Sequence, residues 1–207
     1  PVLLLGTAAG PLGLPGETLE ASGGPEAAAE HCARIEALDR PDLELLEAAA
    51  VYGIAFWDTA ISPRAASRLA ELAGRGLVRK AERSRIAGSG EWRFASRALR
   101  DAAYDRILLG ERASRHEAAG RWLLDHLGGA VGREGALVAR HFELAGRQAE
   151  AAALFAAAGD FAAERGDPEA AAELYRRALG SGGLAPGLRG RVEAFLEALR
   201  DSASTRG

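Results

Sequence analysis

The 207-residue sequence contains no methionine, only one cysteine and only one lysine. Because Cys32 has no second cysteine to pair with, the chain can form neither an internal disulfide nor a cysteine-based zinc site, and we expect a reducing, cytoplasmic location. The opening residues PVLLLG are too few to cross a bilayer and lack the positive flank of a signal peptide, so we expect no membrane partner. The missing start methionine, with Pro1 in first place, indicates a piece of a longer chain.

The motifs that usually carry chemistry are also missing. No G-x-x-x-x-G-K-[ST] loop occurs, and the GSG at 88–90 is typical of a turn between strands, so we expect no bound nucleotide and no other cofactor in this segment. No H-x-x-x-H or H-E-x-x-H spacing occurs either, which argues against a metal site. We interpret the histidines as exposed or hydrogen-bonded residues of helices: His31, His116, His126 and His141. We therefore expect this segment to have no catalytic residues and not to be an enzyme.

A formal net charge of −3 argues against a chain that binds nucleic acid or anionic membranes over its whole surface. Between residues 63 and 106, however, Lys and Arg clearly outnumber Asp and Glu. If this region touched DNA, we would expect the contacts to come from Arg64, Arg68, Arg79, Lys80, Arg83 and Arg85. The helix expected over 62–76 offers no Asn or Gln for base edges, so DNA binding is the weaker alternative.

The residues that are present favour a mainly helical fold. Residues 41–53 begin with Pro41 and end with Gly53, and residues 62–76 begin with Ser62 as the expected N-cap, so each stretch is predicted to be a helix. Two β-like runs follow within residues 77–96, separated by the turn residues 88–90. The order helix, helix, hairpin is typical of a winged-helix module.

Everything after residue 97 has the period of helices. The expected helices cover residues 97–109, 112–127, 133–145, 148–165, 168–180 and 187–200. Residues 146–159 and 166–179 align with each other, with Phe155 matched to Tyr175. Small residues beside one large aromatic residue are typical of tetratricopeptide-like repeats. The expected fold class is therefore mainly α, with a winged-helix module and its small β-hairpin followed by a tetratricopeptide-like α-solenoid.

The stretch 91–110 changes from the period of a strand to that of a helix almost without a loop. We interpret this change as the seam between the two modules. The residues expected to form the structural joint are Phe94, Leu99, Asp101, Tyr104 and Trp122. Phe56 and Trp57 are expected to anchor the first layer of the winged-helix module.

Residues 43–61, 68–80, 92–123 and 138–162 resemble, in this order, the region that follows the ATPase domain in bacterial STAND-type signalling ATPases. The most specific part is a stretch of the type F-x-H-x-L-x-R-D-A-A-Y, matched here by Phe94 and by residues 100–104. Ser96 and Ala98 stand where the family usually has His and Leu. The opening PVLLLGTAAG resembles the late core strand of the P-loop domain, with Ala9 in place of the family's usual arginine.

The resemblance implies three parts: residues 1–38 as a remnant of the ATPase core strand plus linker and helix, 39–110 as a winged-helix-like domain, and 111–207 as tetratricopeptide-like repeats. It implies a non-catalytic regulatory segment whose partners are the ATPase and output domains of its own chain and a protein bound to the repeats. ATP and Mg²⁺ would be bound by the full-length parent. Two alternatives remain open: a DNA-binding winged-helix transcription regulator, and part of an adenylate/guanylate cyclase or Ser/Thr kinase that is active only at full length.

Overall fold

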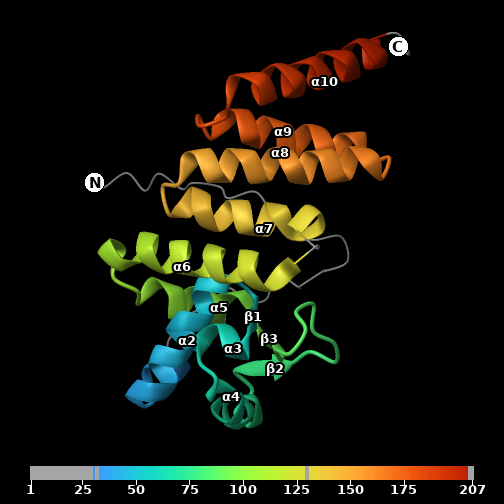
Figure 1. Cartoon of the computed structure of the whole chain (residues 1–207). Coiled ribbons are helices and arrows are strands. Elements are labelled where there is room, and N and C mark those ends of the chain that lie inside the picture. The colour runs from blue at the N-terminus through green and yellow to red at the C-terminus, as the bar shows by residue number, and fades with distance from the viewer. Residues whose placement is uncertain (1–29, 31–32, 129–130, 205–207) are drawn as a thin grey trace.

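The computed structural model describes residues 30, 33–128 and 131–204. The fold is mainly helical with one small three-stranded antiparallel sheet (Figure 1). The strand expected in the opening PVLLLGTAAG lies outside the described residues, as does part of the helix expected before residue 39, whose residues 33–36 are helical in the structure. In chain order the elements are α2 (Arg40–Tyr52), β1 (Ala55–Trp57), α3 (Asp58–Ile61), α4 (Ala65–Gly74), β2 (Val78–Lys80), β3 (Glu91–Phe94), α5 (Arg97–Asp105), α6 (Leu109–Leu127), α7 (Val131–Leu144), α8 (Gln148–Glu164), α9 (Pro168–Gly180) and α10 (Pro186–Ser204).

Residues 40–105, which we call the sheet unit, contain the three strands and helices α2 to α5. The strand order is β1-β3-β2, with β3 antiparallel to both neighbours. Phe56 pairs with Trp92 on one side of β3, and Val78 pairs with Phe94 on the other. The sequence predicted β2 and β3 but missed β1, and the two predicted strands are joined by residues 81–90 instead of by a tight turn at 88–90.

The ends of the first helices follow local chemistry, with one difference from expectation. The side chain of Asp39 accepts a hydrogen bond from the backbone N–H of Asp42 at 2.9 Å, and Gly53, at φ 115°, ends α2 as predicted. Ser62 is not the N-cap of α4, because it directly follows the short helix α3, which the sequence pattern did not reveal. Helix α4 begins three residues later, at Ala65.

The abrupt change from strand to helix is present in the structure. Strand β3 ends at Phe94 and α5 begins at Arg97. Between them, Ser96 caps the helix, because its Oγ accepts a hydrogen bond from the backbone N–H of Leu99 at 3.1 Å. Serine at this position therefore has a local structural role.

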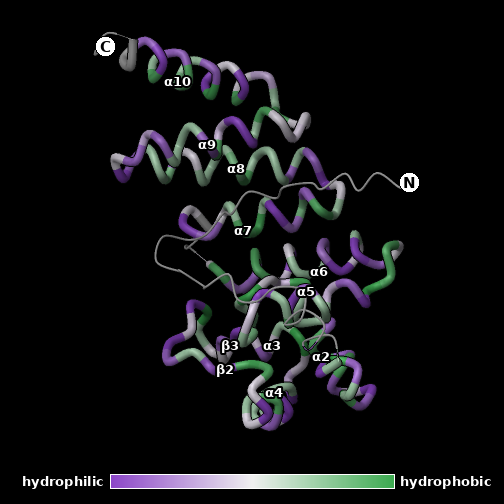
Figure 2. Tube along the Cα trace, turned by 180° about the vertical axis from the view of Figure 1, so that it is seen from behind, coloured by the Kyte–Doolittle hydropathy of each residue, from purple (hydrophilic) through white to green (hydrophobic). Residues whose placement is uncertain are grey.

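Helices α6 to α10 lie one above another and form what we call the helical stack (Figure 1). Hydrophobic and hydrophilic segments alternate along them, as expected for helices that bury one face (Figure 2). Helices α7 and α8 are followed by the same kind of turn, with Gly146 at φ 74° two residues after α7 and Gly166 at φ 77° two residues after α8. The backbone N–H of the residue after each glycine, Arg147 or Asp167, donates a hydrogen bond to the carbonyl of the residue five positions earlier. The two aligned segments thus begin with the same turn.

Two main hydrophobic clusters form the interior. The first lies within the sheet unit and includes Phe56, Phe94 and Leu99. The second runs through the helical stack and includes Phe155 and Tyr175, but it also contains Trp57 and Ile86 of the sheet unit. The interior of the stack therefore continues into the sheet unit.

Close packing between α8 and α9 depends on Gly159. A Cβ atom at this position would lie 2.6 Å from the Tyr175 ring, much closer than real atoms approach. The ring has little freedom to move away, because the Tyr175 hydroxyl donates to Asp160 at 2.6 Å and the ring packs against Phe195 with centroids 4.9 Å apart. A small residue beside a large one thus sets the spacing of these helices.

We expect Gly159→Ala to lower the free energy of unfolding by about 1–2 kcal/mol, because overpacking outweighs the better helix propensity of alanine. Chemical denaturation of the purified chain measures this change. Gly180→Ala is the matched control, since no atom lies within 4 Å of a Cβ atom there. A Gly159→Ala variant as stable as the control would contradict this account of the packing.

Candidate functional site at the joint between the sheet unit and the helical stack

The candidate site is the surface where the sheet unit and the helical stack meet. Within the described residues, no three His, Cys, Asp or Glu side chains are grouped closely enough to hold a metal ion. Every helix described is too short or too polar to span a membrane. At this joint the structure brings together buried polar side chains from distant parts of the sequence, including two histidines that lie 25 residues apart.

Tyr52, the last residue of α2, is the centre of the joint. Its ring packs against both main hydrophobic clusters and against a small third one formed by Val51, Ile107 and Ala119. The centroid distances are 6.4 Å to Trp57, 6.0 Å to Trp122 and 5.9 Å to His141. Burial raises the pKa of the Tyr52 hydroxyl to about 12, so the side chain stays neutral.

Trp57 is a residue of the sheet unit whose side chain packs into the interior of the stack. Neighbouring residues of a strand point to opposite faces, so Phe56 enters the first cluster while Trp57 enters the second. The Trp57 ring lies 6.1 Å from that of Trp122 on α6, and the Trp122 ring stacks on His126 at 4.2 Å. Aromatic pairs of this kind add stability beyond the area that they bury.

A chain of polar contacts links α5, α6 and α7. The Tyr104 hydroxyl lies 2.8 Å from His116 Nε2, and His116 Nδ1 lies 3.0 Å from His141 Nδ1. Tyr104 is flanked by two guanidinium groups, with Arg100 4.5 Å and Arg112 4.6 Å from its ring centroid. Each of these two arginines also donates to backbone carbonyls, Arg100 to Ala50 of α2 and Arg112 to residues of α5.

The two histidines are buried, with 2% of His116 and 3% of His141 exposed. Burial lowers the pKa of both imidazoles, and the positive charges of Arg100 and Arg140 lower both pKa values further. Only one proton fits between the two Nδ1 atoms, because one nitrogen has to donate and the other to accept, so the two imidazoles cannot both be protonated in this contact. The lowered pKa values favour the pair in which both imidazoles are neutral.

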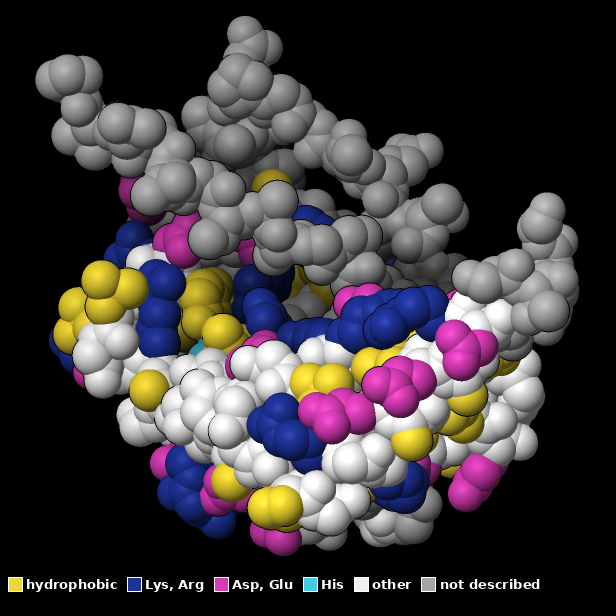
Figure 3. All heavy atoms as spheres, turned by 90° about the horizontal axis from the view of Figure 1, so that it is seen from above, with side chains coloured by type: hydrophobic (Ala, Val, Ile, Leu, Met, Phe, Trp, Pro, Cys, Tyr) yellow, Lys and Arg dark blue, Asp and Glu magenta, His cyan; other side chains and the backbone are white. Residues whose placement is uncertain are grey.

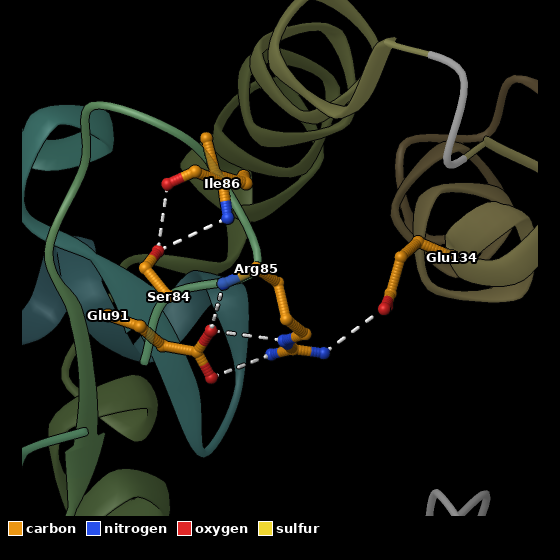
Figure 4. Close-up of polar contacts among 5 residues, drawn as sticks. All are labelled: Ser84, Arg85, Ile86, Glu91 and Glu134. Atoms are coloured by element: carbon orange, nitrogen blue, oxygen red, sulfur yellow. Dashed lines mark hydrogen bonds and ion pairs between the residues drawn. The ribbon is translucent and has the colours of Figure 1, made fainter. Parts of the chain in front are cut away.

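Arg85 provides a second polar link, between residues 81–90 and α7 (Figure 4). Its Nε and Nη2 donate to the two carboxylate oxygens of Glu91 at 3.1 and 3.2 Å, while its Nη1 donates to Glu134 at 3.2 Å. The guanidinium also lies 5.0 Å from the Trp57 ring centroid. Both carboxylate side chains are nearly buried, with 7% of each exposed.

The residues expected to form the joint fall into two groups. Phe94 and Leu99 lie in the core of the sheet unit and not at the contact with the stack, whereas Tyr104 and Trp122 lie at the joint. Asp101 pairs with its neighbour Arg100 at 2.9 Å, and its side chain is 49% exposed. The central position of Tyr52 was not predicted from the sequence, where an aromatic residue at the very end of an apolar helix is the only local signal.

The basic residues considered for nucleic acid are divided between the surface and internal ion pairs. Arg68 pairs with Asp42 at 2.8 Å and Asp39 at 3.3 Å, and Arg85 pairs with the two glutamates. Lys80 lies over the Trp92 ring at 5.6 Å. Arg64, Arg79, Lys80, Arg83 and Arg85 are exposed, and Arg68 is half-buried. Acidic and basic side chains lie beside one another over the described part of the face seen from the α10 end (Figure 3).

No family model, curated protein or solved structure matches this chain. Any functional conclusion therefore rests on the geometry of the joint and on the sequence pattern.

The histidine pair predicts that acid weakens the fold. Because the folded-state pKa values of His116 and His141 lie below their ordinary value of 6.5, the unfolded chain binds protons more readily as the pH falls through that value. Between pH 7.5 and 5.5 we expect the free energy of unfolding to fall by about 1 kcal/mol for each histidine. Urea denaturation at a series of pH values measures this change.

The controls separate this pair from other groups. His126→Gln, at an exposed position, should keep the full pH dependence, and His116→Asn should remove about half of it. Stability that stays constant between pH 7.5 and 5.5 in the unmodified chain would show that the pair is not held neutral.

Proposed function

We propose that this chain is a non-catalytic regulatory and protein-interaction segment of a STAND-type bacterial signalling ATPase. In this proposal the sheet unit is a winged-helix module and the helical stack is a tetratricopeptide-like array. The order of α2, β1, α3, α4, β2 and β3 and the strand order β1-β3-β2 support the first assignment. The shared turn that precedes α8 and α9 supports the second.

The observation that carries the proposal is the continuous, buried joint around Tyr52. Two modules joined by a flexible linker could move independently, whereas modules that share a packed core move together. Binding of a protein partner to the stack would therefore also change the position of the sheet unit. This change would in turn alter the packing of the ATPase and output domains of the parent. ATP and Mg²⁺ would act in that ATPase domain, and the cytoplasm would be the site of signalling.

The proposal predicts a P-loop ATPase domain in the same reading frame. Because the segment would hold the ATPase inactive until a partner binds, deletion of residues 40–204 from that full-length protein should raise basal ATP turnover by roughly 5- to 150-fold, the usual range for coupling between sites. Tyr52→Ala should raise turnover partway by loosening the joint. Tyr52→Phe is the matched control, because it keeps the ring and loses only a 3.4 Å hydrogen bond to the carbonyl of Ala60.

Two results would contradict the proposal. One is a reading frame that encodes no P-loop domain. The other is an ATP turnover that neither the deletion nor Tyr52→Ala changes.

A DNA-binding transcription regulator is the alternative function, and a gel-shift assay distinguishes it from the proposed one. Because Arg68 and Arg85 are engaged in ion pairs with acidic side chains of the same chain, Arg64, Arg79, Lys80 and Arg83 remain of the six considered. We expect no retardation of duplex DNA in a gel-shift assay at low salt, where even non-specific binding is strongest. Retardation that disappears on raising the salt would instead favour the regulator.

A further inference from the structure

Residues 81–90, which we call the strap, connect β2 to β3 and pass over the joint. The end next to β3 is fixed to the sheet unit by Asp58, whose carboxylate accepts from Ser89 Oγ at 3.1 Å and from the N–H of Gly90 at 2.8 Å. A Cβ atom on Gly90 would lie 2.4 Å from Asp58 Oδ2, so glycine is needed for this close approach. This end of the strap is therefore a fixed base.

Among the described residues, the ion pair between Arg85 and Glu134 links the middle of the strap to the stack. The Arg85 guanidinium donates two parallel hydrogen bonds to the carboxylate of Glu91 in its own unit and one hydrogen bond to Glu134 of α7 (Figure 4). A two-bond pairing of guanidinium and carboxylate is stronger and more specific than one bond. If the strap moves away from the stack, the bond to Glu134 is the one that breaks, and Arg85 keeps its partner Glu91.

The arrangement in the structure, in which Arg85 binds Glu134, has two free-energy costs that breaking this bond would relieve. Two nearly buried carboxylates share one guanidinium, and a freed Glu134 gains water while remaining in the first turn of α7, where the helix dipole favours an anion. In addition, the indole Nε1 of Trp57 is buried and has no hydrogen-bond partner among the described residues. Water that enters on opening can satisfy this N–H group.

The closed arrangement also has an apolar contribution. Ile86, the residue after Arg85, is 2% exposed and belongs to the cluster that contains Trp57 and the interior of the stack. Ser84 holds the strap in shape here, because its Oγ donates to the carbonyl of Ile86 at 2.9 Å and accepts from its N–H at 3.2 Å. Opening would take Ile86 out of this cluster.

From these contacts we infer that the strap is a lid on the joint, closed by the Arg85–Glu134 ion pair and by Ile86, and that it opens by breaking this pair while its base at Asp58 stays in place. Opening uncovers the apolar surface around Trp57 without unfolding either unit. This inference concerns the chain by itself and does not depend on the proposed function.

Limited trypsin digestion of the full chain tests the inference, because Arg83 and Arg85 lie within the strap and mass spectrometry identifies each cut. Cleavage of a locally opened segment follows its open population when reclosing is fast. Glu134→Gln keeps the shape of the side chain and the Arg85–Glu91 pair but weakens the closing contact. We expect it to raise the rate of cleavage after Arg83 and Arg85 by about tenfold, the usual size for a hydrogen bond between charged groups.

Glu164→Gln, which removes the same charge from an exposed position on α8, is the matched control and should leave the rate unchanged. Cleavage in the strap of Glu134→Gln within twofold of the control would overturn the inference. An equal rise at all sites of the chain, together with a lower global stability, would overturn it as well, because Glu134 would then stabilise the whole fold instead of closing a lid.

Discussion

The packing of Tyr52 is the contact on which the arrangement of this molecule depends. Its ring is the point at which the interior of the sheet unit, the interior of the helical stack and the small cluster around Ile107 come together. Because protein interiors are close-packed, a ring of this size fits only when its neighbours are in place. The direction in which the stack leaves the sheet unit is thus set by the end of α2, a helix that the chain completes well before the stack begins.

Polar groups make this arrangement specific. Hydrophobic surfaces can pack in several ways at similar free energy, but a buried hydrogen-bonding group is costly unless its partner is in reach. The pair His116–His141 connects α6 to α7, and Arg85 connects α7 to the sheet unit. These contacts lie among the same helices that surround Tyr52, so the polar and apolar constraints select a single position for α7.

The sequence was informative where the signal is local. Proline and glycine mark several helix ends, and the periods of the apolar residues place most of the helices within a few residues, whereas the N-cap expected at Ser62 was wrong and the cap formed by Ser96 was not predicted. Strand β1 was missed because three residues are too few to show an alternation. The charge of Arg85 was evident, but its partner Glu134 lies 49 residues away, and the two histidines are 25 residues apart. Such contacts arise from tertiary packing, which a single sequence does not display.

The neighbouring positions of Phe56 and Trp57 have a consequence for how this chain can change over evolution. A short strand supplies one side chain to the core of the sheet unit and the next to the joint. An insertion of one residue before β1 that shifts the strand by one position in its pairing with β3 would exchange the two faces, so that both interiors would be damaged by one event. The glycine turns of the stack impose no such coupling, because a helix pair added there meets only its neighbours. Lineages of such a chain should therefore vary in the number of helices in the stack far more readily than in the length of the segment between α2 and β1.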